Sequence, residues 1–192
     1  YIGSKIALGV FEKNLLMKLI RTDTGQSLKD HIDFSGFNSS AVAKKKTKFN
    51  FNNTIAFIEP HIEQGPVLEK TKTPLGIVTG IRGSFRYRKA RCIGKYLHSG
   101  ATPIDYRSDS VLAVSTLVAE MNNVWKQELK KNKDLTITFG EFYTDNKEHS
   151  FAKSSGLVNF CVDVRSNSKT TLNKIKKTLF KKVKKIEKET NT

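Results

Sequence analysis

The sequence predicts a mixed α/β fold, with an α/β segment over residues 1–83 and an α+β segment over residues 84–192. In the first segment, two short apolar runs bounded by turn residues are typical of buried strands. In the second, alternating runs typical of half-exposed strands are separated by runs of helical period. With 38% hydrophobic and 9% aromatic residues, a chain of this length can build a core.

The first segment opens with apolar residues in a helical pattern, so we expect one helix with an irregular start over residues 1–22. Ser27 is expected to cap a short helix that runs to about Phe34, and Gly36 to end it. Residues 38–53 are polar and rich in lysine, which favours a surface loop with at most one helical turn.

Residues 54–59 and 75–81 are apolar runs that predict two buried strands, with a short helix starting at Val67 between them. His61 follows the first of these strands. Loops at strand ends are where α/β folds place ligand-binding groups, because the strand holds an exposed loop in position. Taken alone, His61 with Glu63 is a weak metal signal, and a hydrogen-bonded surface histidine is the simpler interpretation.

In the second segment, residues 85–96 alternate as a strand with one wet face. Ser108 or Asp109 is expected to cap a long helix, and residues 135–143 and 157–165 predict two more strands before a final helix. The resulting order, β-α-β-β-α, is a split βαβ arrangement that lacks its last strand.

The net charge of +16 raises the question of nucleic acid or an anionic membrane as a partner. Half of the excess lies in residues 165–192, where apolar residues recur at the spacing of an amphipathic helix. Lysine dominates and no aromatic residue is interleaved on the basic face, so a solvated helix face is favoured and nucleic-acid binding is the least favoured function.

No stretch has the roughly 18–20 apolar residues of a membrane span, and the N-terminus lacks the apolar core of a signal peptide. We therefore expect a cytoplasmic protein with no membrane partner. Cys92 and Cys161 lie in apolar strand-like runs and are interpreted as small buried side chains without a disulfide or metal.

Two segments carry a family resemblance: HIEQGPVLE at residues 61–69 and LHSGATPIDYR at residues 97–107. They resemble signature segments of the zinc-dependent amidohydrolases that include N-carbamoyl-L-amino-acid hydrolases, allantoate amidohydrolases and beta-alanine synthases. The resemblance implies a metallopeptidase-like fold, in which residues 1–83 form part of a catalytic domain and residues 84–192 most of a lid and dimerisation domain.

The same resemblance implies hydrolysis of non-peptide C–N bonds in linear amides or amidines, with a small ureido or amidine substrate. A pair of zinc ions, with manganese as an alternative, would serve the complete homodimeric enzyme. By the resemblance, His61 is a metal ligand and Gln64 helps to hold the substrate. His98 would reach the active site of the partner subunit and stabilise negative charge, and Arg165 would bind the substrate carboxylate.

The sequence also departs from the family pattern. The family's other metal ligands and its Glu-Glu segment have no counterpart here, so the chain resembles an incomplete piece and is expected to be inactive alone. Ala152 stands where the family commonly has a substrate-binding asparagine, and His149 or Lys153 would be the alternatives. A second hypothesis, from a different class, is a non-catalytic interaction module that dimerises through the second segment.

Overall fold

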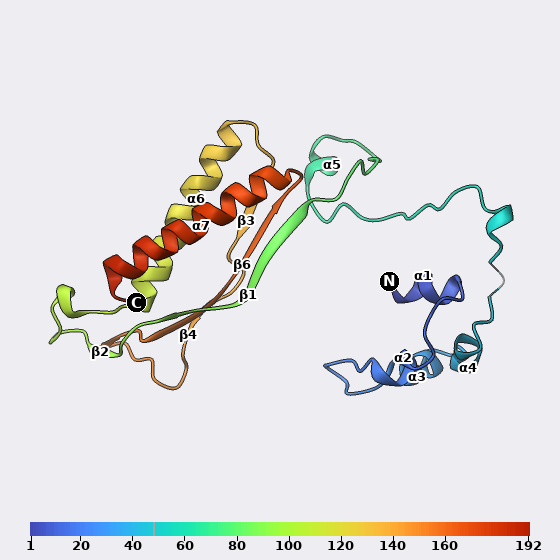
Figure 1. Cartoon of the computed structure of the whole chain (residues 1–192), viewed down its shortest axis with the longest axis horizontal. Coiled ribbons are helices and arrows are strands. Elements are labelled where there is room, and N and C mark those ends of the chain that lie inside the picture. Colours follow the sequence, from blue (N-terminus) through green and yellow to red (C-terminus); the bar gives the residue numbers. More distant parts are fainter. Residues whose placement is uncertain (48) are drawn as a thin grey trace. The chain divides into compact units, whose positions relative to one another are not determined.

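The computed structural model describes residues 1–47 and 49–192, with Phe51 described by its backbone alone. The chain divides into two units, Tyr1–Lys72 and Thr73–Thr192 (Figure 1). The first strand of the second unit begins at Gly83. The sequence thus predicts a division between residues 83 and 84, whereas the structure divides the chain after Lys72. The two units are described separately.

The first unit consists of short helices joined by irregular segments. In chain order these are α1 (Ile2–Ala7), α2 (Leu15–Lys18), α3 (Leu28–Phe34), α4 (Ser39–Ala43), the 3-10 helix η1 (Phe51–Asn53) and α5 (Val67–Lys70).

Two predictions on the helices of this unit have different outcomes. The single helix over residues 1–22 is wrong, because Gly9 adopts a left-handed φ of 68° after α1, and α2 begins only at Leu15. The helix capped by Ser27 is confirmed as α3. The Ser27 hydroxyl accepts from the Asp30 amide at 3.2 Å, and the Asp30 carboxylate accepts from the Ser27 amide at 3.0 Å.

The predicted surface loop at residues 38–53 contains α4 and η1, and its Lys48 lies outside the described residues. The buried strands predicted at 54–59 and 75–81 are wrong. Both runs are irregular and open to solvent, with Ile55 103% and Ile77 95% exposed. A strand needs a hydrogen-bonded neighbour to persist, and the part of the chain that the structure describes offers neither run such a neighbour.

The second unit combines an antiparallel sheet with two long helices, so the expected mixed α/β character is confirmed. Its elements are β1 (Gly83–Ile93), β2 (Leu97–His98), the 3-10 helix η2 (Ile104–Tyr106), α6 (Ser110–Lys130), β3 (Thr136–Thr138), β4 (Phe142–Thr144), β5 (Lys153–Ser154), β6 (Leu157–Ser166) and α7 (Lys169–Thr190).

Strand β6 lies in the middle of the sheet. It pairs antiparallel with β1 on one side and with β3 and β4 on the other. Beyond the start of β6, the two-residue strands β2 and β5 form a further antiparallel pair. The long predicted strand at 135–143 is thus two short strands, interrupted around Gly140, where the Cys161 amide bonds to the Glu141 carbonyl instead.

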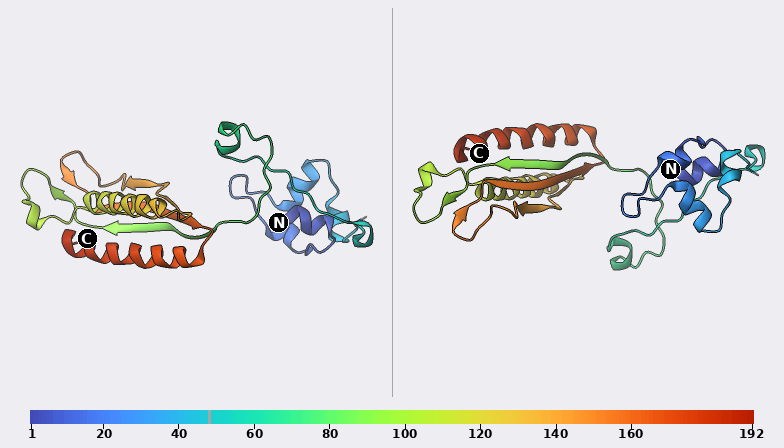
Figure 2. Two further views of the ribbon diagram at one scale, coloured as in Figure 1. Left: turned by 90° about the horizontal axis from the view of Figure 1, so that it is seen from above. Right: turned by 90° about the horizontal axis from the view of Figure 1, so that it is seen from below.

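The core of the second unit lies between one face of the sheet and both helices. Alternate residues of β6, from Val158 to Val164, are buried against Met121 of α6 and Ile175 of α7. The other set of β6 side chains points to the opposite face, which no helix covers among the described elements. Viewed from below, the strands lie in front of α6 (Figure 2).

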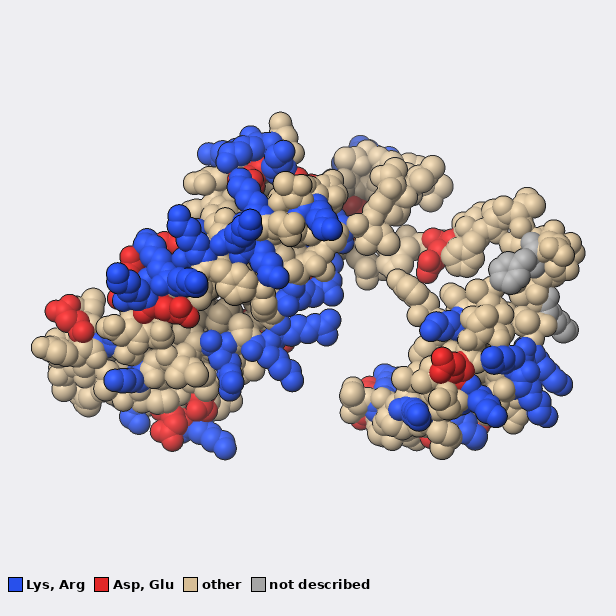
Figure 3. All heavy atoms as spheres, viewed as in Figure 1, with Lys and Arg blue, Asp and Glu red and all other residues tan. Residues whose placement is uncertain are grey.

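The basic C-terminal helix is docked through its apolar stripe, as the sequence pattern predicts. Its lysines form a band on the surface of the second unit (Figure 3). Three of them pair with carboxylates of α6. Lys174 lies 2.8 Å from Glu128, and Lys182 and Lys185 lie 2.8 and 3.6 Å from Glu120. These contacts lower the pKa of both glutamates. Within the described residues, no helix is both long enough and apolar enough to cross a membrane.

Replacing Ile175 by Ala tests this packing. Ile175 is fully buried between α7 and the sheet, and the lost contacts and remaining cavity should reduce the free energy of unfolding by about 3 kcal/mol. Urea denaturation followed by circular dichroism measures this change. The matched control is Lys176→Ala on the exposed face of the same helix, expected within about 0.5 kcal/mol of the unsubstituted chain. Equal losses in both variants would contradict this packing.

Candidate functional site

His61 lies in the irregular segment before α5, with its side chain exposed. Its Nδ1 is 2.5 Å from the carbonyl oxygen of Ile62. A carbonyl oxygen only accepts, so Nδ1 of the neutral ring carries the proton and Nε2 keeps a free lone pair. A backbone carbonyl at Nδ1 is a common arrangement for histidines that bind metal through Nε2.

The residues that follow His61 have other tasks. Glu63 accepts from the amides of Val67 and Leu68, both at 2.9 Å, and so caps the start of α5 with both carboxylate oxygens. It is therefore engaged as a cap and not available as a second metal ligand. Gln64 is exposed and has a left-handed φ of 56°, a conformation that costs a residue with a side chain roughly 1–3 kcal/mol.

The described residues of this chain do not form a complete metal site. Among residues 1–47 and 49–192, no group of three or more His, Cys, Asp or Glu side chains is close enough to hold a metal ion. A zinc site needs three or four such ligands. The chain thus offers single ligand-competent groups such as His61, and these residues by themselves do not fit a zinc ion.

His98 ends β2, where it pairs with Lys153 of β5, and its ring is exposed. Its Nδ1 accepts a hydrogen bond from the Gly100 amide at 3.2 Å. Because Nδ1 accepts, Nε2 of the neutral ring carries the proton and points a donor outward. This is the opposite tautomer to that of His61.

The turn that carries His98 is held by backbone contacts. The Arg107 guanidinium donates to the carbonyl oxygen of Thr102 at 2.8 Å and to that of Ser99. Gly94 approaches so closely that an added Cβ would lie 2.0 Å from the Ser108 carbonyl oxygen. A Cβ on Gly156 would lie 2.5 Å from the Tyr96 ring. Both glycines are therefore required for the close packing beneath this turn.

The helix cap expected at Ser108 or Asp109 is confirmed at Asp109. The Asp109 carboxylate accepts from the first amides of α6, at 3.0 and 3.2 Å. Ala152 contacts the same turn through its carbonyl oxygen, which accepts from the Ser99 amide at 2.8 Å. His149 and Lys153, the alternatives to it, line one hollow of about 450 Å³.

Arg165 lies near the end of β6 with an exposed side chain. Its Nε and Nη2 donate to Oδ2 of Asp163 at 2.8 and 2.6 Å, and Arg86 of β1 donates to Oδ1 at 3.1 Å. The hydrogen bonds from Arg165, followed by those from Arg86, hold the pKa of Asp163 below its usual value. Sequence reasoning missed Asp163 and Arg86, although the two-residue spacing of Asp163 and Arg165 places both on one strand face.

One copy of the chain does not bring His98 and Arg165 together. His98 pairs with Lys153, whereas Arg165 pairs with Ser84 at the opposite end of the β1–β6 pair. Twelve residues separate positions 153 and 165 along the chain, equivalent to roughly 30–40 Å of extended strand. Figure 1 shows β2 at the far end of the sheet from the start of β1.

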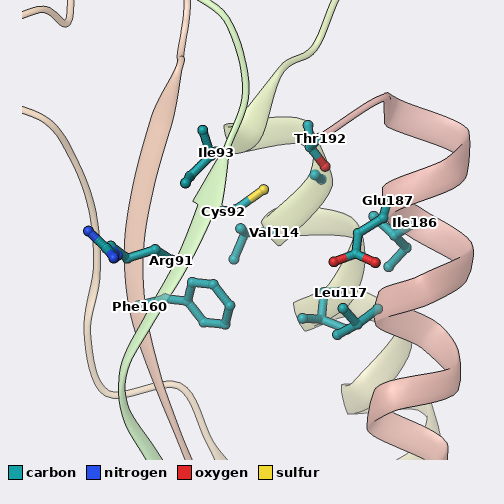
Figure 4. Close-up of a pocket in the computed structure, with 11 residues that line it drawn as sticks. Arg91, Cys92, Ile93, Val114, Leu117, Phe160, Ile186, Glu187 and Thr192 are labelled. Carbon is teal, nitrogen blue, oxygen red and sulfur yellow. The ribbon is translucent and has the colours of Figure 1, made fainter.

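An apolar pocket of about 240 Å³ lies between β1, α6 and α7 (Figure 4). Cys92, Val114 and Ile186 line it, and burial raises the pKa of the Cys92 thiol. Cys92 and Cys161 were expected to be buried; both are free thiols that are only partly buried. The pocket contains none of the candidate residues His61, Gln64, His98 or Arg165, so we regard it as part of the core packing.

The sequence of the chain was compared with those of known proteins. No family model matches the chain. The allantoate amidohydrolase of Bacillus subtilis is 32% identical over 165 residues, which cover 86% of this chain and 37% of that protein. The N-carbamoyl-L-amino-acid amidohydrolase of a Pseudomonas strain is 30% identical over 128 residues, covering 67% of this chain and 30% of that protein.

Solved structures give the same result. A hydantoinase/carbamoylase family amidase from Burkholderia ambifaria superposes with a TM-score of 0.77 at 25% identity, over 99% of this chain and 44% of that one. The chain belongs to the hydantoinase/carbamoylase family of amidohydrolases. It spans about a third of the length of the curated family members that it matches. These members are named as hydrolases, so the family is enzymatic, as the resemblance implied.

The ion pair between Arg165 and Asp163 leads to a testable prediction about the pKa of Asp163. Arg165→Gln removes the largest cause of the low pKa of Asp163, so this pKa should rise toward its ordinary value. Titration of the Asp163 side-chain carbon by NMR measures the change. The control is Arg91→Gln on β1, whose side chain has no ion pair with Asp163 in the described structure; an equal rise there would contradict the assignment.

The sign of the pH effect follows from the direction of the shift. The folded-state pKa of Asp163 lies below its unfolded value, which is about 3.9. The stability that the pair contributes is therefore present above that value and is lost as the pH falls through the folded-state pKa. The Arg165→Gln variant should lose less stability than the unsubstituted chain over this acid range.

Proposed function

We propose that this chain supplies part of a zinc-dependent amidohydrolase that cleaves the C–N bond of a small ureido or amidine substrate, of the N-carbamoyl amino acid or allantoate type. One observation carries the proposal. The backbone fixes His61 and His98 as opposite tautomers, with a free lone pair on Nε2 of His61 and a proton on Nε2 of His98. The first suits a metal ligand and the second a donor to a developing oxyanion.

The domain roles follow the same proposal. Residues 1–83 would contribute to a catalytic domain, with His61 as one metal ligand and Gln64 at the substrate. Residues 84–192 would form most of a lid and dimerisation domain. In a complete site, zinc would lower the pKa of bound water and would polarise a carbonyl group. Relatives named allantoate amidohydrolase and N-carbamoyl-L-amino-acid amidohydrolase support this class of substrate.

Arg165 is proposed to bind the substrate carboxylate. Its guanidinium is planar and exposed, and it is oriented by Asp163 through two nitrogens on one edge. The remaining nitrogen is free to donate to a carboxylate, and a charge-assisted bond of this kind fixes the orientation of the ligand. Asp163 is then a positioning residue, because it holds Arg165 without touching the substrate.

The complete site is proposed to form between two copies of the chain. His98 and Arg165 lie at opposite ends of the sheet within one copy. A two-fold related pair would allow His98 of one subunit to reach the active site that contains Arg165 of the other. The homodimer is thus part of the proposed function and supplies a residue that a single copy cannot provide.

Measuring ammonia release from N-carbamoyl-L-amino acids and allantoate tests the proposed reaction. The complete protein product of the gene that encodes this chain, supplied with zinc, should release ammonia. The purified 192-residue chain should not, because its described residues form no group of ligands that could hold zinc. Activity of the isolated chain would contradict our assignment of an incomplete site. No release by the complete product with either substrate class would contradict the proposed reaction.

Subunit mixing tests the shared site in the complete product. His98→Ala and Arg165→Gln should each reduce turnover by about 100-fold or more. Random pairing of the two variants makes half of the dimers mixed, and each mixed dimer keeps one intact site of two, so about a quarter of the activity should return. His31→Ala serves as a control, because His31 contacts only Thr24 among the hydrogen bonds found for its ring in the described structure. No recovery on mixing would contradict the shared site.

The alternative is a non-catalytic interaction module. Two observations favour it: the absence of a three-ligand metal group from the described residues, and the outer edge of β1, which pairs with no strand in the same described part. This function predicts self-association of the chain in analytical ultracentrifugation together with an inactive complete product. Ammonia release by the complete product would exclude it.

A further inference from the structure

The open face of the sheet contains a polar hollow at the middle of β1. Its volume is about 560 Å³, which is within the range of small-molecule sites. The residues that line it come from β1, β6 and the β3–β4 region: Arg88, Lys89, Ala90, Arg91, Glu141, Tyr143, Asn159 and Phe160. None of these was singled out as a site residue by the sequence or by the family resemblance.

A β-bulge shapes this hollow. The register passes from Tyr87 opposite Val162 to Ala90 opposite Phe160, so Arg88 and Lys89 together face the single residue Cys161. The extra residue changes the alternation of β1, with the result that Arg91 points to the open face and not into the core. Bulges often re-aim side chains beside functional sites, and here one gathers cationic residues.

Within the described part of the chain, the cations of the hollow have no ionic partner. Among the ion pairs of the described residues, none involves Arg88, Lys89 or Arg91. On the same strand, Arg86 does have one, namely Asp163. The lining holds three cations and one carboxylate, Glu141, which leaves a net charge of +2. Such a hollow attracts anions.

Two neutral polar groups complete the lining. Arg91 pairs with Asn159, and Asn159 pairs with Tyr143, so the three side chains form a row across β1, β6 and β4. Directly opposed residues have Cβ atoms roughly 4.5–5.5 Å apart, so one small ligand can contact the whole row. The row offers a guanidinium fork, an amide and a phenol hydroxyl.

We propose that this hollow is a binding site for a small molecule with an oxyanion group, a phosphate or a carboxylate. Arg88 and Arg91 bind the oxyanion, since guanidinium groups match these anions with paired hydrogen bonds. Asn159 and Tyr143 bind the polar remainder of the ligand. The site is distinct from Arg165, which lies six residues beyond Asn159, roughly 20 Å along the strand. It does not depend on the proposed hydrolase activity.

NMR titration of the full 192-residue chain tests this site, with inorganic phosphate and citrate as separate probes at physiological ionic strength. At least one probe should give saturable shifts at the amides of residues 88–91, 141–143 and 159. Saturation by phosphate alone identifies a phosphate site, by citrate alone a carboxylate site, and by both a general oxyanion site. The absence of saturable shifts with both probes would overturn the proposal.

Matched variants distinguish binding of the probe at the hollow from nonspecific attraction of anions to a basic protein. Arg88→Gln with Arg91→Gln should weaken binding of the saturating probe by about tenfold or more, because charge-assisted hydrogen bonds are lost. Lys181→Gln with Lys184→Gln removes the same charge from exposed, unpaired positions of α7, and should weaken binding by less than about twofold. Similar losses in both double variants would overturn the site.

A further variant that leaves the net charge unchanged distinguishes the loss of a ligand contact from loss of the fold. Tyr143→Phe removes only the hydroxyl from an exposed side chain and should weaken binding by a few-fold while the circular dichroism spectrum stays unchanged. If Tyr143→Phe binds the probe as tightly as the unsubstituted chain, the row of Arg91, Asn159 and Tyr143 is not the binding surface and the proposal fails.

Discussion

The structure of the second unit depends on the two-sided alternation of β6. One set of its side chains, from Val158 to Val164, is removed from water by α6 and α7, and apolar burial of this kind is the main favourable term in folding. The other set, which includes Asn159, Asp163 and Arg165, is thereby fixed on the open face. Because the side-chain period of a strand is two, a slip of one residue would bury the charges and expose the core. Core packing and candidate chemistry are therefore set by the same register.

Local signals in the sequence predicted local structure well. Ser27 was predicted as one cap and Ser108 or Asp109 as another, and the structure shows Ser27 and Asp109 in these positions. Caps can be predicted because their side chains accept from free amides of neighbouring residues. The apolar runs at 54–59 and 75–81 gave a wrong result, since a strand requires a partner that sequence pattern does not supply. The bulge at Arg88 and Lys89 was not foreseen either. The bulge arises from the pairing of β1 with β6. The alternation of polar and apolar residues within β1 alone does not reveal it.

The candidate residues show a similar division. The segments around His61 and His98 were recognised from their sequence, but their tautomers follow from single contacts with Ile62 and Gly100 that only coordinates reveal. Arg165 was named alone, whereas the structure gives it Asp163 as a companion and Arg86 as a competitor for the same carboxylate. Motifs therefore indicated which residues to consider, and hydrogen bonds indicated what each of them is able to do.

The two glycines beneath the His98 turn have a consequence for motion. With the Ser108 carbonyl pressed on Gly94 and the Tyr96 ring on Gly156, the β2–β5 pair has little room to slide against the rest of its unit. The His98 imidazole therefore moves together with the rigid unit that carries it. Any approach of that ring to a substrate then requires rotation of the whole α+β body, and its speed would be set by a hinge outside the body and not by the turn that bears the ring.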